Sequence, residues 1–385
     1  MSPPEDKNAL PLANLVVVEL GHSVAAPFAG QILGDLGAKV VKIEKSDGGD
    51  DARTWGPHFL DDTSTTFLCL NRNKYSVRMN LRDPAQVERL RKFITTRADV
   101  VVQNLRPGSV EKLGLDSASL RALNERLIYC NLGAFGKKGP LSHLPGYDPI
   151  MQAYGGIMSV TGEEGRPPVR VGVSLVDMGT GMWAVIGILS ALQQRNLNGR
   201  GCEVDVSLYE SALAWMTVPV ASYTASGELP VRLGSGAVIT APYGAYRTRD
   251  GHMIIAAGNQ ALFAKLSHAL GHREWVDDAR FRTNEDRLKN KQHLETLIET
   301  ELAAKPTLAW VSLLEDAGVP CGPIQDVSQV LTAPQTEALG ILQETSHDAL
   351  RLVGLPISFD GARPGLRLPP AQFGEHTDEI LGRTP

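Results

Sequence analysis

Residues 171–183 (VGVSLVDMGTGMW) combine an aspartate, two glycines that closely follow it and the start of a long apolar run. Asp177 stands directly before that run, where aspartate commonly caps the first turn of a helix. Gly179 and Gly181 follow within the next turn, and each disfavours a helix interior by about 1 kcal/mol relative to alanine. A helix cap alone does not account for glycines that carry this cost. Glycines at these positions would instead let a bulky ligand and an oxyanion approach the helix N-terminus. Asp177 therefore has two interpretations, a helix cap or a nucleophilic carboxylate.

The elements that must position this segment alternate between strand and helix over the first half of the chain. An apolar run at 15–20, a helical stretch at 27–36 closed by Gly37, and a second apolar run at 39–43 form a βαβ unit. Further strands are expected at 76–81, 99–103, 128–132 and 202–208, and further helices at 84–96, 117–126 and 177–194. This alternation predicts a large, doubly wound, Rossmann-like α/β lobe over residues 1–224.

The pattern changes near residue 225, where glycines and prolines precede short strands. Strands are expected at 246–248 and 253–257, and helices at 260–270, 284–303 and 307–317. We therefore predict a smaller α+β lobe over residues 225–325. The proline-rich segment 326–385 is expected to return to the large lobe.

Composition limits the class of protein. The chain has 385 residues and a formal net charge of −5, with no dense basic stripe, so nucleic acid is not an expected partner. Its 4 cysteines are widely spaced, which favours a reducing cytoplasm over a disulfide framework. The N-terminus lacks the apolar core of a signal peptide, and the apolar segment at 182–192 is too short to span a bilayer. A soluble cytoplasmic protein without a membrane partner is expected.

Patterns that often mark cofactor or metal sites are incomplete in this sequence. Glu44 ends the second strand, as the ribose-binding acid of a dinucleotide site would, but the turn after the first strand lacks G-x-G-x-x-G. A P-loop motif is also absent. His268 and His272 lie four residues apart without a nearby acidic ligand motif, so a surface pair is the simpler interpretation. No metal and no organic cofactor are expected.

Several motifs, taken in order, resemble the class III coenzyme A transferases, the superfamily of formyl-CoA transferase, carnitine CoA-transferase and α-methylacyl-CoA racemase. The resemblance runs almost end to end, through segments 27–43, 71–74 (NRNK), 103–108 (QNLRPG), 146–148 (GYD), 171–181, 199–205 and 319–324. In that family the aspartate matching Asp177 is the catalytic nucleophile. The resemblance implies a cofactor-free CoA-transferase, with acyl-CoA and carboxylic acid substrates and with anhydride and thioester intermediates on Asp177.

The same resemblance implies contacts to CoA from four residues in the matched motifs. Lys74, Asn104 and Arg106 are expected near the phosphates, and Lys137 matches a position that the family uses near CoA. For each cation the alternative is a solvated surface charge.

A loop of the smaller lobe is expected to cover the active site by the same resemblance. It comprises Gly258, Asn259 and Gln260, between an expected strand and an expected helix. An ordinary turn between strand and helix is the alternative. Formyl-CoA transferases carry a run of glycines here, and the single Gly258 argues against formate and oxalate as the acids.

Racemases of the superfamily carry a histidine at the position of Tyr147, next to an aspartate that matches Asp148. Tyrosine, with an ordinary pKa near 10, is a poor proton shuttle at neutral pH, so acyl transfer is favoured over racemisation. A racemase and a catalytically idle CoA-binding member remain the alternatives.

The succinyl-CoA:glutarate CoA-transferase branch gives the nearest resemblance, through segments 51–57, 71–74 and 258–263. It implies a succinyl-CoA-type donor and a short dicarboxylic acid as acceptor. The candidates for substrate contacts are His22, Arg53, Arg72 and Tyr147. Since family members form interlocked homodimers, the same assembly is implied here.

Overall fold

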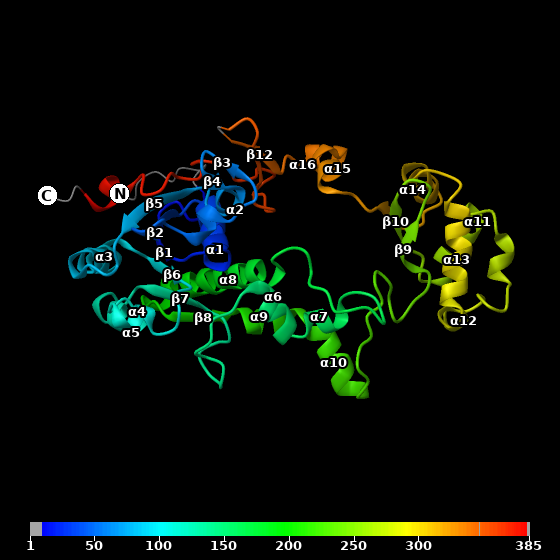
Figure 1. The fold of residues 1–385 in the computed structure, drawn as a ribbon, viewed down its shortest axis with the longest axis horizontal. Helices are drawn as coiled ribbons and strands as arrows, with labels where there is room; N and C mark the ends of the chain where they lie inside the picture. Colours follow the sequence, from blue (N-terminus) through cyan, green and yellow to red (C-terminus); the bar gives the residue numbers. More distant parts are fainter. Residues whose placement is uncertain (1–9, 346, 383–385) are drawn as a thin grey trace. The chain divides into compact units, whose positions relative to one another are not determined.

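The computed structural model describes residues 10–345 and 347–382, which form two compact units (Figure 1). Unit 1 contains the described residues of Met1–Ile157, Arg170–Gly227 and Glu337–Pro385. Unit 2 contains Met158–Val169 and Glu228–Thr336. The predicted mixed α/β fold with a parallel sheet is confirmed, and each unit is assembled from separate stretches of the chain.

A parallel sheet of 6 strands, in the order β5-β2-β1-β6-β7-β8, forms the centre of unit 1. The strands are β1 (Val16–Leu20), β2 (Lys39–Lys45), β5 (Lys74–Met79), β6 (Val100–Gln103), β7 (Ile128–Gly133) and β8 (Glu203–Ser207). The direction in which the chain adds strands reverses between β1 and β6. In such sheets the crevice at the carboxyl ends of these two strands is where ligands bind.

Helices cover both faces of the sheet, which explains the continuous apolar runs of its central strands β1 and β6. Helices α1 (Ala25–Asp35) and α8 (Leu175–Asn198) pack against each other, and α8 also contacts β7 and β8. A second core lies under α3 (Pro84–Arg97), α4 (Ser109–Lys112) and α5 (Ser117–Leu123). Val18 belongs to this second core, and its neighbour Val17, on the other face, is equally buried.

Shorter elements complete unit 1. They are the 3-10 helix η1 (Asp51–Thr54), β3 (Phe59–Leu60), β4 (Thr63–Ser64), α2 (Thr65–Leu70), α6 (Asp148–Tyr154), α9 (Leu208–Trp215), α10 (Thr217–Ser226), β12 (Leu342–Glu344), β13 (Arg351–Val353) and α17 (Thr377–Leu381). The chain passes between the units four times, in α7 (Ile157–Val160), before Arg170, after Gly227 and in α16 (Pro334–Leu339).

The C-terminal segment of unit 1 runs along the edge strand β5. The backbone N–H of His376 donates to the carbonyl of Ser76 at 2.9 Å, and the N–H of Asn73 donates to the carbonyl of Leu368 at 2.9 Å. The free edge of the sheet at β5 is thereby covered by a part of the chain that is distant in sequence.

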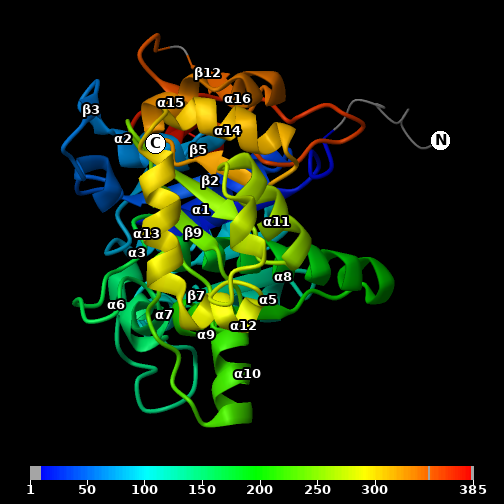
Figure 2. The same ribbon diagram turned by 90° about the vertical axis from the view of Figure 1, so that its right-hand side faces the viewer.

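Unit 2 contains an antiparallel sheet of 3 strands in the order β11-β10-β9, with helices packed around an apolar core. Its elements are β9 (Tyr243–Arg247), β10 (His252–Ala256), α11 (Gln260–Ala269), η2 (Arg273–Val276), α12 (Asn284–Lys289), α13 (Lys291–Leu302), α14 (Thr307–Asp316), β11 (Cys321–Pro323) and α15 (Val327–Thr332). Figure 2 shows α13 in yellow beside β9, in agreement with their contacts.

The single helix expected at 284–303 is interrupted at Asn290, between α12 and α13. The side-chain amide of Asn290 donates to the carbonyls of Asp286 (2.9 Å) and Arg280 (3.1 Å). Asparagine often ends a helix in this way, because its amide competes with the backbone for hydrogen bonds.

Among the described residues, α8 is the one helix with the length and hydropathy of a membrane span, with a mean hydropathy of 1.6 over its most apolar window. Half of that window is buried inside unit 1, and core helices of globular proteins meet the same criterion. Length and composition therefore do not by themselves indicate a membrane segment here.

Candidate active site

A pocket of about 1070 Å³ opens at the carboxyl ends of β1, β6, β7 and β8, all in unit 1. Of the residues predicted from sequence, its lining includes His22, Asn104, Arg106, Lys137, Tyr147 and Asp177. The pocket thus lies at the crevice where the strand order reverses, the expected ligand position in a doubly wound sheet.

Asp177 is the third residue of α8 and does not cap it, because the helix already begins at Leu175 after Ser174. The expectation that the helix starts behind Asp177 is therefore wrong. Ser174 makes no capping hydrogen bond with its own side chain. The cap comes from Asp148 on α6, whose Oδ2 accepts from the backbone N–H of Val176 at 2.8 Å and of Asp177 at 3.2 Å.

Gln152, one turn after Asp148 on α6, ties the segment before α8 to the same helix. Its Nε2 donates to Oδ1 of Asp148, and its Oε1 accepts from the N–H of Val171 at 2.8 Å. Asp148 and Gln152 are both buried. Together they hold the chain on both sides of the turn that leads to Asp177.

The side chain of Asp177 is partly buried, lines the pocket and makes no hydrogen bond or ion pair with the described residues. Burial and the nearby Asp148 carboxylate raise the pKa of Asp177 to about 7. A carboxylate left unpartnered in a pocket has an unsatisfied negative charge, and it is more basic and more nucleophilic than a solvated one.

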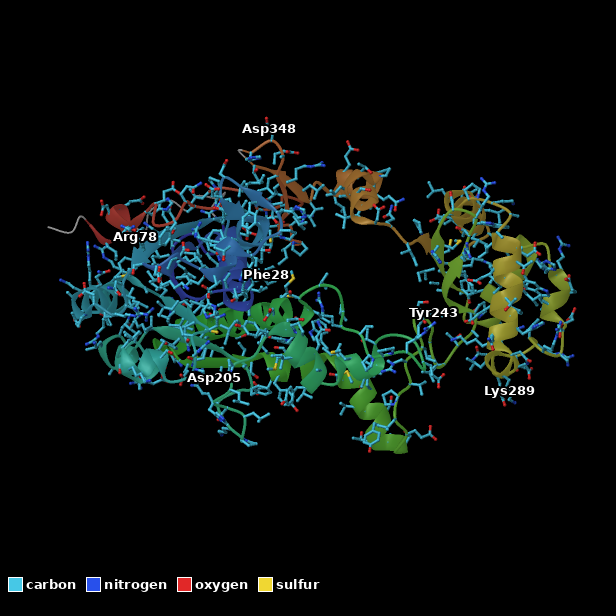
Figure 3. All side chains as sticks on the ribbon, in the orientation of Figure 1. Phe28, Arg78, Asp205, Tyr243, Lys289 and Asp348 are labelled. Carbon is cyan, nitrogen blue, oxygen red and sulfur yellow. The ribbon has the colours of Figure 1, made fainter. Side chains whose placement is uncertain are left out.

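Gly179 and Gly181 are explained by packing inside the unit. A Cβ at Gly181 would lie 2.8 Å from the carbonyl oxygen of Ala25 on α1, and a Cβ at Gly179 would lie 2.9 Å from Nε1 of Trp215. Phe28, labelled on α1 in Figure 3, also lies close to Gly181. The expectation that these glycines admit a ligand is wrong. They allow α8 to pack closely against its neighbours. Two amides at this helix N-terminus, those of Val176 and Asp177, are already bonded to Asp148.

The loop after β1 presents His22 to the pocket in a fixed conformation. Asn104, which follows β6, accepts from the N–H of His22 at 3.0 Å and donates to its carbonyl at 2.9 Å. Ser23 has a left-handed backbone (φ 69°), and its N–H donates to Asp50 at 3.0 Å. Burial lowers the pKa of His22, so the imidazole is neutral at pH 7.

Arg106 and Lys138 are the cations of the pocket lining that have no ion pair among the described residues, and both side chains are exposed. Lys137 instead pairs with Glu203 at 2.6 Å and with Asp205 at 2.9 Å. Asp205 is labelled on β8 in Figure 3. The pocket therefore offers two free positive charges and a third that is held by carboxylates.

Lys74, Arg53 and Arg72 are buried in ion pairs and do not line the pocket. Lys74 Nζ lies 2.9 Å from Oε2 of Glu19, whose other oxygen pairs with Lys42. Burial lowers the pKa of Lys74 to about 8, although Glu19 favours the charged form.

The two buried arginines each pair with a carboxylate of unit 1. Arg53 lies 2.8 Å from Glu44, and Arg72 lies 2.7 Å from Asp35. The guanidinium of Arg53 also packs 3.7 Å from the ring centroid of Phe67.

The predicted loop of Gly258, Asn259 and Gln260 belongs to unit 2 and is bonded within that unit. Thr240 Oγ1 donates to the carbonyl of Gly258 at 2.6 Å, and Arg287 donates to Oε1 of Gln260 at 2.9 Å. Asn259 caps α11 by accepting from the N–H of Leu262 at 2.9 Å. Thr240 stands so close that a Cβ at Gly258 would lie 2.2 Å from its Oγ1, which explains the glycine.

Asp148 and Lys138 were not among the sequence-based candidates for this site, and Asp148 had been matched only to an aspartate of the racemases. Asp148 carries a local signal, because an aspartate followed by Pro149 is typical of a helix N-terminus, but its contact with α8 depends on the fold. Lys138 stands next to the chosen Lys137, and the sequence offered no reason to prefer it. Among the described residues, no group of three or more His, Cys, Asp or Glu side chains is arranged to hold a metal ion.

Comparisons with known proteins agree on one family. The sequence profile of CoA-transferase family III matches residues 12–377. Mouse succinyl-CoA:glutarate CoA-transferase is 36% identical over 374 residues, which cover 96% of this chain and 86% of that protein. Acetyl-CoA:oxalate CoA-transferase of Acetobacter aceti is 38% identical over 365 residues, which cover 92% of each chain. The crystal structure of a CAIB/BAIF family protein from Brucella suis matches with a TM-score of 0.90 and 38% identity, covering 97% of this chain and 98% of that one.

Proposed function

The chain belongs to CoA-transferase family III and is an enzyme that transfers CoA between an acyl-CoA and a carboxylic acid, and from this premise we propose a succinyl-CoA-type donor, a short dicarboxylic acid as acceptor and Asp177 as nucleophile. The observation that carries the proposal is the side chain of Asp177, which lines the pocket without a partner among the described residues.

The proposed reaction proceeds through two kinds of covalent intermediate on Asp177. A carboxylate oxygen attacks the thioester carbon of the donor, and the carbon–sulfur bond breaks to give a mixed anhydride and CoA thiolate. The thiolate attacks the Asp177 carbonyl, releases the donor acid and leaves an aspartyl-CoA thioester. The acceptor carboxylate attacks that thioester and expels the thiolate, which then takes the new acyl group and frees Asp177.

CoA is proposed to bind with its phosphates near Arg106 and Lys138. Both cations line the pocket and are unpaired among the described residues, so each can approach a phosphate without giving up an ion pair. Lys137 would exchange its carboxylates on β8 for a phosphate. Asn104 is proposed to act by holding the His22 loop, because its amide is already bonded to that backbone. No metal or organic cofactor takes part in these steps.

A dicarboxylic acid acceptor is supported by what several relatives are named for. The mouse and Agrobacterium fabrum relatives are a succinyl-CoA:glutarate and a succinate–glutarate CoA-transferase, at 36% and 35% identity. The Acetobacter aceti relative is named for oxalate, a dicarboxylic acid that the single Gly258 had argued against for this chain. In this chain, His22 and Tyr147 line the pocket and are the proposed contacts for the acid, whereas Arg53 and Arg72 are engaged in buried ion pairs.

A homodimer is proposed because unit 1 exposes a stripe of large apolar side chains on α8. Met182 is 49% exposed, Trp183 46% and Ile186 50%. The adjoining helices α9 and α10 add Trp215 and Val218. Large apolar side chains that are exposed together on adjoining helices are typical of a protein interface. We also propose a cytoplasmic location, which suits the free cysteines.

A panel of acyl-CoA donors and free acids tests the proposed reaction, with products identified by mass spectrometry. Succinyl-CoA with glutarate is expected to give glutaryl-CoA, and intact-mass analysis should show a CoA thioester on a peptide containing Asp177. Loss of both product and adduct in Asp177→Ala is expected. Exchange of an α-proton without any acyl transfer would instead indicate a racemase, and tight CoA binding without exchange an idle binder.

The proposed interface is tested by sedimentation velocity of Ile186→Glu beside Leu308→Glu. Leu308, on α14, is 70% exposed, so it is a matched apolar-to-charged control. The Ile186 variant is expected to dissociate and the Leu308 variant to stay dimeric. A wild-type protein that sediments as a monomer would contradict the homodimer.

A further inference from the structure

The carboxylate of Asp148 has a geometric relation to Asp177 that neither helix could supply alone. The first amides of a helix have no acceptor within the helix. In α8 two of them, at Val176 and Asp177, are bonded to a single oxygen of Asp148 from a different helix. Ser174, the residue in the capping position, contributes no side-chain bond.

The other oxygen of Asp148 is bonded as well, so its rotamer is fixed. Gln152 donates to that oxygen and, with its own amide oxygen, accepts from the N–H of Val171. Both side chains are buried, with exposures of 4% for Asp148 and 0% for Gln152. A buried side chain bonded at each oxygen has little freedom to move, and the main chain that it holds is restrained with it.

From this geometry we propose that Asp148 is a positioning residue, which fixes the backbone of Asp177 so that the nucleophilic carboxylate faces the pocket without serving as the cap of its own helix. The proposal rests on the proposed role of Asp177. It assigns to Asp148 no contact with substrate. Its effect on the reaction is the placement of the attacking oxygen, and misplacement by about 1 Å can lower a rate by about 100-fold.

A pair of substitutions separates the hydrogen bonds from the charge. Asp148→Ala removes the acceptor of both α8 amides. The double variant Asp148→Asn with Gln152→Glu retains an acceptor for those amides, a hydrogen bond between the two side chains and an acceptor for Val171, with the negative charge one turn further along α6. Asp83→Ala is the matched control, because Asp83 caps α3 by accepting from Ala85 at 2.9 Å, away from the pocket.

Steady-state kinetics and formation of the Asp177 adduct are measured for each variant. Asp148→Ala should lower kcat about 100-fold with less than a threefold change in the KM for acyl-CoA, and the double variant should recover kcat to within about tenfold of the wild type. Asp83→Ala should lower the melting temperature and leave kcat unchanged.

Two results would overturn the positioning role. One is an Asp148→Ala variant that retains kcat within threefold of the wild type. The other is a double variant that folds with the wild-type melting temperature and still loses kcat 100-fold. That result would refute the positioning role even if Asp148→Ala fails to fold. An active Asp177→Ala would instead refute the proposed function, so the two failures are distinguishable.

Discussion

Asp148 and Asp177 are two carboxylates that the fold brings together through the main chain, since Oδ2 of Asp148 lies 3.2 Å from the backbone nitrogen of Asp177. The hydrogen bond holds the backbone of Asp177, while the negative charge of Asp148 opposes ionisation of the Asp177 side chain. Burial is the larger cause and acts in the same direction, and the two effects raise the pKa of Asp177 to about 7. The residue that positions the nucleophile therefore also makes its carboxylate more basic.

The pH dependence of catalysis should report this pKa. Attack requires the carboxylate, so kcat/KM is expected to fall about tenfold per unit as the pH drops below about 7. The double variant at positions 148 and 152 moves a negative charge away from Asp177, so its acidic limb should shift to lower pH. The measurement is a pH profile of CoA exchange with each enzyme. An acidic limb near pH 4 in the wild type would contradict the raised pKa.

Loss of the Asp177 side chain should separate activity from stability. Because it caps nothing and has no partner among the described residues, Asp177→Ala is expected to abolish exchange without lowering the free energy of unfolding. The raised pKa of Asp177 predicts that the variant is more stable than the wild type at pH 7 and above, because the buried carboxylate opposes folding there. Asp83→Ala should do the reverse, costing about 1 kcal/mol through loss of a true cap. Urea unfolding and CoA-exchange assays on both variants check this. A large loss of stability in Asp177→Ala would show that it has a structural role.

Removal of either unpaired pocket cation should weaken acyl-CoA binding. Arg106→Ala and Lys138→Ala are each expected to raise the KM for acyl-CoA about tenfold, with a smaller effect at high salt because surface charges are screened. Lys112→Ala is the control, since Lys112 is exposed on the nearby α4 and does not line the pocket. Initial rates at two salt concentrations measure the effect. An unchanged KM in both pocket variants would place the phosphates elsewhere.

Lys74 should be a determinant of stability. Lys74→Met removes the ammonium between Glu19 and the carbonyl of Pro27 in a buried cluster, and should cost about 3–5 kcal/mol. Lys45→Met removes an exposed partner of Asp51 and should cost less than about 1 kcal/mol. Urea unfolding of the two variants gives the comparison. If Lys74→Met has the stability of the wild type and a raised KM for acyl-CoA, Lys74 would instead be a CoA ligand.

The close packing of α8 on α1 predicts that alanine is harmful at Gly181 despite its better helix propensity. The added methyl group would meet the backbone oxygen of Ala25 at 2.8 Å, so Gly181→Ala should destabilise the protein by about 1–3 kcal/mol. Ser190→Ala, on the exposed side of the same helix, should be nearly neutral. Thermal unfolding of both variants tests this, and a more stable Gly181→Ala would show that the helices can separate.

Local patterns were sufficient for the parallel sheet because its central strands, such as β1 and β6, are buried on both faces. The runs of β1 and β2 are mainly apolar, and they were recognised within one or two residues of their ends. The later strands of the parallel sheet were predicted equally well. For example, β7 spans Ile128–Gly133, and a strand was expected at 128–132.

The partners of charged side chains could not be predicted, because they come from elements distant in sequence. Nothing near Lys74 shows that Glu19 of β1 lies beside it, so a buried cation resembled a ligand-binding one. Asp177 likewise resembled a cap, since the true cap, Asp148, stands 29 residues away in the chain. Fold-dependent contacts of this kind decide which of several similar residues is free to do chemistry.

The C-terminal segment along β5 has a consequence for biosynthesis. During synthesis, Ser76 leaves the ribosome long before Gly374, which lies 298 positions later in the chain. The backbone N–H of Gly374 donates a hydrogen bond to the hydroxyl of Ser76. Until then the outer edge of β5 has no cover from that segment, and an uncovered strand edge can pair with another chain. Expression of a chain that stops after unit 2 should therefore yield aggregates. Until residues 368–376 are made, the nascent protein depends on a chaperone to stay in solution.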